Sequence, residues 1–89
     1  MKLKITKSAR QFGYLIWTSK EADELYDLIQ HKDVVKVRFN GFPLGDKNVD
    51  RRYHRISLGF RQTRAMPESN QYFVICYKKG VLEVSSVDE

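Results

Sequence analysis

The sequence predicts a mainly β domain of the α+β class, either a small barrel or a twisted antiparallel sheet with one short helix. Short apolar segments that alternate or are rich in β-branched and aromatic residues predict strands, and turn signals separate them. Only one segment has helical periodicity, so nothing indicates a doubly wound parallel sheet. A chain of 89 residues fits a single domain, with the expected order β-β-α-β-β-β-β-β.

The first 44 residues are expected to form a hairpin, a helix and a second hairpin. Residues 2–6 and 14–17 form the first two strands, and the polar segment 7–13, which ends in glycine, is expected to be a connection. A helix over 18–30 begins with Thr-Ser-Lys-Glu, which fits the capping box, and its apolar residues recur at helical spacing.

The second hairpin is predicted by a strong turn signal. Residues 34–39 alternate, so Val35, Val37 and Phe39 would share one face, and an Asn-Gly pair follows them. The return strand over 42–44 contains a proline, which places it at a sheet edge.

Residues 45–89 are expected to be arginine-rich antiparallel strands joined by polar loops. Segment 51–60 alternates and is expected to be one strand. Segment 71–77 is apolar on both faces and is expected to be central, and 81–85 completes the sheet.

Basic charge is concentrated in one segment. The chain has a net charge of +5, and residues 51–64 hold five arginines, one histidine and no acid. On an extended strand, Arg51, Tyr53 and Arg55 would form a row, and Arg61 would follow them. Guanidinium groups pair with phosphate oxygens, and a tyrosine between them would stack on an unpaired base. This segment therefore favours a polyanionic partner.

Four short segments resemble the AbrB/SpoVT swapped-hairpin family of DNA-binding proteins: KITKSAR (4–10), LIW (15–17), EADELYDLI (21–29) and KDVVKVRFNG (32–41). In that family, two chains interleave their hairpins into one small barrel whose basic loop ends and strands face DNA. The resemblance implies an interleaved homodimer and DNA contacts at Lys4, Lys7 and Arg10.

Together these features predict a nucleic-acid-binding protein, a small transcription regulator whose partner is DNA, with duplex favoured over single-stranded DNA, or RNA. The predicted contact residues are Lys7, Arg10, Arg51, Arg52, Tyr53, Arg55, Arg61 and Arg64. One alternative is a protein-interaction module or inhibitor, of the phage or mobile-element type, that docks on an acidic partner. The other is a single-stranded DNA- or RNA-binding barrel.

No catalytic residue, cofactor or metal site is predicted. One cysteine and two histidines give no zinc spacing, and the five glycines are scattered. A single cysteine, Cys76, is typical of a reducing compartment, and no segment is apolar enough for a signal peptide or a membrane span. We therefore expect a cytoplasmic protein without membrane partners.

Overall fold

The computed structural model describes residues 1–89 and confirms the mainly β fold class, with seven strands and three helices. In chain order the elements are β1 (Lys2–Lys4), α1 (Lys7–Phe12), β2 (Tyr14–Ile16), α2 (Ser19–Leu28), β3 (Val34–Phe39), β4 (Phe42–Asn48), β5 (Arg55–Ser57), α3 (Phe60–Arg64), β6 (Tyr72–Lys78) and β7 (Val81–Val87).

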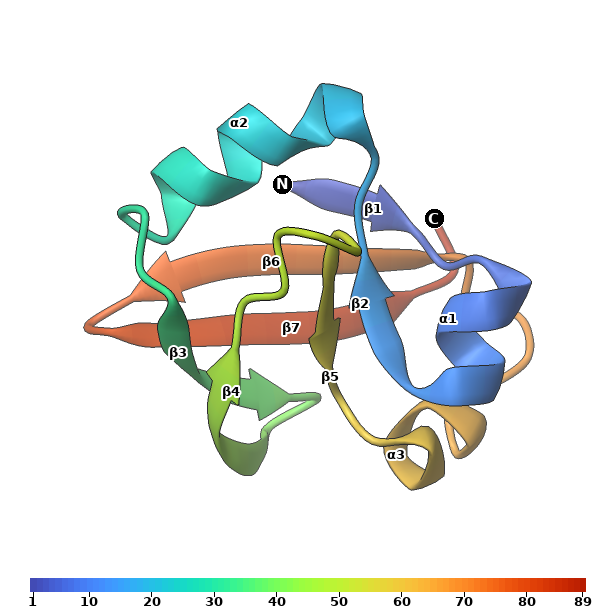
Figure 1. The fold of residues 1–89 in the computed structure, drawn as a ribbon. Coiled ribbons are helices and arrows are strands. Elements are labelled where there is room, and N and C mark those ends of the chain that lie inside the picture. Colours follow the sequence, from blue (N-terminus) through green and yellow to red (C-terminus); the bar gives the residue numbers. More distant parts are fainter.

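The strands form two sheets. A five-stranded sheet has the order β1-β6-β7-β3-β4, and β2 and β5 form a two-stranded sheet that crosses in front of it (Figure 1). The larger sheet is open, because β1 and β4 are its edges. Of the two predicted architectures, the protein therefore forms a sheet and not a barrel. One pair departs from the expected antiparallel order: β3 and β7 run parallel. The long chain between them allows the crossover that a parallel pair needs.

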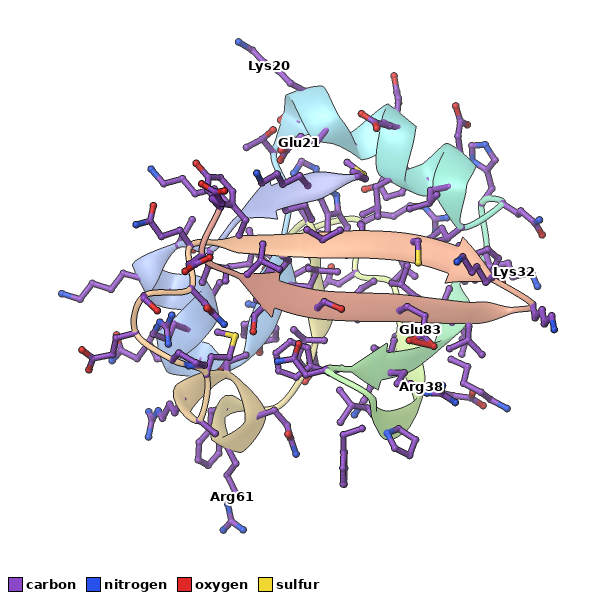
Figure 2. All side chains as sticks on the ribbon, turned by 180° about the vertical axis from the view of Figure 1, so that it is seen from behind. Lys20, Glu21, Lys32, Arg38, Arg61 and Glu83 are labelled. Carbon is purple, nitrogen blue, oxygen red and sulfur yellow. The ribbon has the colours of Figure 1, made fainter.

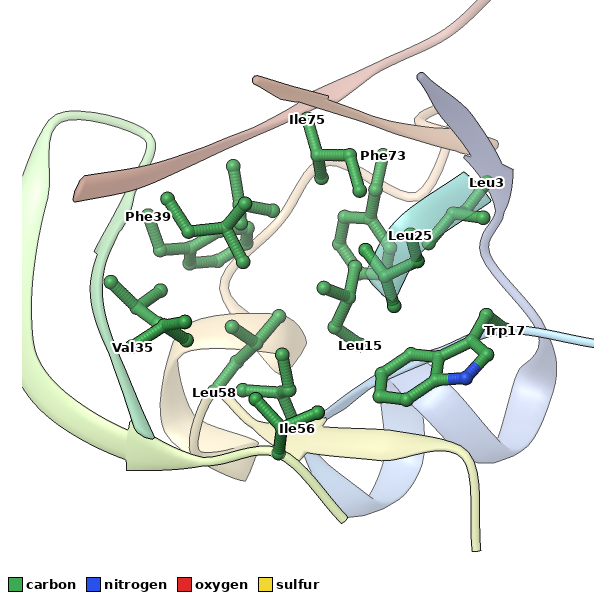
Figure 3. Packing of buried hydrophobic residues seen from close by; sticks show 14 of the residues in the cluster. Leu3, Leu15, Trp17, Leu25, Val35, Phe39, Ile56, Leu58, Phe73 and Ile75 are labelled. Atoms are coloured by element: carbon green, nitrogen blue, oxygen red, sulfur yellow. The ribbon is translucent and has the colours of Figure 1, made fainter. Parts of the chain in front are cut away.

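The core lies between the two sheets and α2. It is one cluster of 18 buried residues that draws on both the first 44 residues and the rest of the chain. Figure 3 shows Leu15 and Ile56, from the small sheet, facing Phe73 and Ile75 of β6. The alternation of β3 is confirmed, because its buried positions are every second residue. The back of the large sheet carries no covering element (Figure 2).

Several predicted elements are confirmed with small changes at their ends. The capping box of α2 is present, with the backbone N–H of Thr18 donating to Oε1 of Glu21 at 2.8 Å. The central position of β6 and the edge position of β4 are also as expected. β4 is longer than predicted, because it extends to Asn48 through residues assigned to a loop.

The predicted first hairpin, two strands joined by a connection over 7–13, is wrong, since β1 pairs with β6, β2 pairs with β5, and α1 occupies the connection. The hydroxyl of Thr6 accepts a hydrogen bond from the backbone N–H of Ala9 at 3.0 Å, and Gly13 ends the helix with φ +80°. Six residues with one fully buried position, Ala9, give no readable periodicity. Only glycine fits at position 13, because a Cβ there would lie 2.2 Å from the backbone nitrogen of Phe60.

The predicted strand over 51–60 is also wrong over most of its length. Only Arg55–Ser57 pairs, as β5, while 51–54 forms a turn and α3 begins at Phe60. The turn is closed by Asp50, whose backbone N–H and C=O both bond to Arg55 and whose carboxylate accepts from the N–H of Tyr53 at 3.0 Å. A short Asp side chain that bonds its own turn competes with extended structure.

Candidate nucleic-acid interface

The expected row of Arg51, Tyr53 and Arg55 on one strand face does not form. Arg51 lies in the turn and forms an ion pair with Asp33, and it donates to the carbonyl oxygens of His31 at 3.1 Å and Lys32 at 3.3 Å. Its guanidinium carbon is 4.9 Å from the centre of the Tyr26 ring. These contacts hold the 51–54 turn against the chain that follows α2, so Arg51 stabilises the fold.

Arg10 is likewise committed to the backbone. Its guanidinium donates to three carbonyl oxygens, those of Met66 at 3.1 Å, Pro67 at 3.1 Å and Asn70 at 2.9 Å. The buried hydroxyl of Thr63, in α3, donates to the carbonyl of Arg10 at 2.7 Å. Arg10 therefore links the loop after α3 to α1 through hydrogen bonds, and few of its N–H donors remain for a phosphate.

Arg55 lies among aromatic rings. Tyr14 pairs with Ser57 and Ile16 with Arg55, so the side chains of Tyr14 and Arg55 are diagonal neighbours on the outer face of the small sheet. The guanidinium carbon of Arg55 is 4.3 Å from the centre of the Tyr14 ring and 5.0 Å from that of Tyr53. Nε of Arg55 also lies 3.5 Å from Oδ2 of Asp50.

The same arrangement continues on both sides of β5. Arg52 is 5.4 Å from the centre of the Tyr53 ring, and that tyrosine is 58% exposed. In α3, Arg64 is 4.9 Å from the centre of the Phe60 ring and donates to the carbonyl of Gln11 at 3.3 Å. The turn, β5 and α3 follow one another along the chain (Figure 1), so the arginines of these contacts belong to one continuous segment.

Two further predicted contact residues are exposed cations. Arg61, in α3, projects away from the body of the molecule (Figure 2) and forms no ion pair. Lys7 is exposed at the first residue of α1. Their side chains are available to a partner.

We call the side chains of Tyr14, Arg52, Tyr53, Arg55, Phe60, Arg61 and Arg64 the arginine–aromatic surface. The sequence had identified its arginines and Tyr53 but not the other two rings. The period of two along β2 could have identified Tyr14, because Leu15 and Trp17 are buried and alternate with it. No local signal could have identified Phe60, since α3 was not expected.

Beside this surface lies a polar groove between β4 and the small sheet, lined in part by Asp46, Lys47, Asn48 and Asp50. The two carboxylates there place negative charge next to Arg55.

The structure contains no group of three or more His, Cys, Asp or Glu side chains that could hold a metal ion. His54 stacks on Trp17, with ring centres 6.2 Å apart, and His31 pairs with Asp27 at 2.8 Å. None of the three helices has the length and apolar character needed to cross a membrane.

No protein-family model, curated protein or solved structure matches the chain. The resemblance to swapped-hairpin proteins stays a prediction, together with the homodimer and the DNA contact at Lys4 that it implies.

Proposed function

We propose that the protein binds nucleic acid through the arginine–aromatic surface and prefers single strands to duplex. The observation that carries the proposal is the repeated contact between guanidinium groups and rings: Arg52 with Tyr53, Arg55 with Tyr53 and Tyr14, and Arg64 with Phe60. In proteins that bind single strands, cationic side chains follow the phosphates and aromatic rings stack on the bases.

The preference for single strands rests on the exposed rings. Tyr53 and Phe60 are 58% and 49% exposed, and a base can stack on such a ring only when it is free of its own duplex. The paired strands β2 and β5 share only three residue pairs, which is short for a ribbon that enters a major groove. Both features favour the single-strand alternative over the duplex-binding regulator that the sequence had suggested.

The charge pattern supports a polyanion as the ligand. Arg61 has no ion pair, and Arg52 and Arg64 contact rings and a carbonyl instead of carboxylates. Because each phosphate contact releases counterions, affinity should fall steeply as salt is raised. A role in transcription regulation would follow only if the bound strand proved to be a control site.

The test is fluorescence anisotropy with a labelled oligothymidine and a duplex of the same length, each titrated at low and moderate salt. We expect the single strand to bind more tightly, with an affinity loss of about tenfold or more for a fourfold rise in salt. Tighter binding to the duplex would overturn the preference. Undetectable binding to both at low salt would overturn the function and favour an acidic protein partner.

A further inference from the structure

A second candidate binding site for the strand lies on the side of α3 that faces the turn between β3 and β4. A groove separates this helix from the turn between β3 and β4, and Phe42, Gln62 and Met66 are among its lining residues. Met66 and Phe39 form a buried apolar floor, whereas Phe42 is 57% exposed. The groove therefore presents an exposed aromatic ring beside an apolar floor.

The polar groups at this groove differ in their availability. Asn40 is held by Ser86, because its amide donates to Oγ of Ser86 and accepts from the N–H of Ser86, both at 2.9 Å. Gln62 is half-buried and its side chain makes no hydrogen bond within the protein. A free amide offers a donor and an acceptor side by side, which is the pattern that the edge of every nucleobase can complement.

The cations next to the groove are those of the arginine–aromatic surface. Arg61 and Arg64 do not line the groove, but they lie one and two residues from Gln62 in α3, so a phosphate backbone that contacts them lies within one helical turn of the groove. A peptide could fill the floor and pair its backbone with the amide of Gln62, so the neighbouring arginines, which suit phosphates, are the feature that favours a nucleotide here.

We propose that this groove holds one unpaired base of the bound strand, stacked on Phe42 and hydrogen-bonded to the amide of Gln62. The inference rests on the proposed function, because it extends the same binding surface past α3. It assigns Phe42 and Gln62, which the charge pattern of the sequence does not indicate, to contact with a base.

Two variants test the proposal with the oligothymidine as probe. Phe42→Leu keeps the apolar bulk and removes the ring face, and we expect it to weaken binding about tenfold. Gln62→Ala removes only the amide, and we expect a loss of about threefold to fivefold. Tyr72→Leu, which removes a ring from β6, is the control, and it should change affinity less than about twofold. Circular dichroism verifies that each variant is folded.

Photocrosslinking locates the base directly. An oligothymidine with iodouracil substitutions should form an adduct on the peptide that contains Phe42, and the adduct should be absent in Phe42→Leu. Crosslinks confined to Tyr14, Tyr53 and Phe60, with parental affinity in Phe42→Leu, would overturn this inference and leave the proposed function intact. Failure of the parent protein to bind the probe would overturn both.

Discussion

Arg10 and Arg61 carry the same guanidinium group, but their surroundings differ completely. Arg10 donates to three backbone carbonyl oxygens of one loop, whereas Arg61 projects into solvent without an ion pair. Arg51 resembles Arg10, because it contacts Asp33 and two carbonyl oxygens, and Arg52 resembles Arg61, because only a tyrosine ring lies near it. Arg10 and Arg51 thus stabilise the fold, Arg52 and Arg61 remain available to a partner, and Arg55, which contacts Asp50 as well as two rings, shares both properties.

The difference between the arginines that stabilise the fold and those that remain available to a partner has a simple physical basis. A guanidinium group has five N–H donors, and buried or half-buried carbonyl oxygens need partners wherever the backbone leaves helices and strands. The loop after α3 and the segment after α2 supply such oxygens, and Arg10 and Arg51 donate to them. Contact with a ring, by contrast, leaves the donors free for phosphate oxygens.

The largest expected effect is that of Arg10→Ala on stability. The free energy of unfolding should fall by about 2–4 kcal/mol, because three carbonyl oxygens lose a charged donor. Urea denaturation measures the change. Arg10→Lys should recover only part of it, since one ammonium cannot meet oxygens that are spaced for a planar fork. If Arg10→Ala lowered the free energy of unfolding by less than about 0.5 kcal/mol, Arg10 would not stabilise the fold as proposed.

Arg51→Ala should have a smaller effect of the same kind. We expect a loss of about 1 kcal/mol, because the side chain is 36% exposed and water can replace part of its contacts. The affinity for oligothymidine should stay within about twofold of the parent value. A large drop in affinity without a change in stability would show that Arg51 contacts the ligand. It would contradict the assignment of Arg51 to the arginines that stabilise the fold.

Arg55→Ala should affect both properties, because Arg55 contacts Asp50 as well as two rings. We expect a stability loss of about 0.5–1 kcal/mol and an affinity loss of about fivefold. Urea denaturation and anisotropy on the same preparation separate the two effects. An unchanged affinity would remove Arg55 from the arginine–aromatic surface.

The smallest expected effects belong to Arg52→Ala. Its stability should change by less than about 0.5 kcal/mol, because the side chain is exposed and contacts only Tyr53. The affinity should fall by about twofold to fivefold through the loss of one phosphate contact. A shift in the unfolding midpoint without a change in affinity would assign Arg52 to the stabilising group.

The sequence predicted those elements whose signals are local. The alternation of β3, the turn at Asn40 and the capping box of α2 each involve residues close in the chain, and each is present. The two short helices were missed because five or six residues do not establish a period, and the N-cap of α3, Gly59, has no side chain that could signal a helix start. The parallel pairing of β3 and β7 depends on the whole chain between them.

The candidate site was predictable in composition but not in arrangement. An arginine-rich stretch with one tyrosine was visible, but the row of Arg51, Tyr53 and Arg55 required a strand that Asp50 interrupts. The contacts that distinguish Arg10 are 56 to 60 residues away in the chain, and those of Arg51 are 18 to 20 residues away. No local pattern encodes such separations, so only the folded structure separates the two groups of arginines.

The most direct test of the account is the salt dependence of oligothymidine binding in two variants that lose the same charge. Arg52→Ala/Arg61→Ala removes two cations from the arginine–aromatic surface, and Lys78→Ala/Lys79→Ala removes two from the end of β6 and the turn that follows it. The first should bind about tenfold more weakly at low salt and reduce the slope of log affinity against log salt by about 1.4, while the second keeps the parental slope. Equal slopes and equal affinities in the two variants would contradict the assignment of binding to this surface.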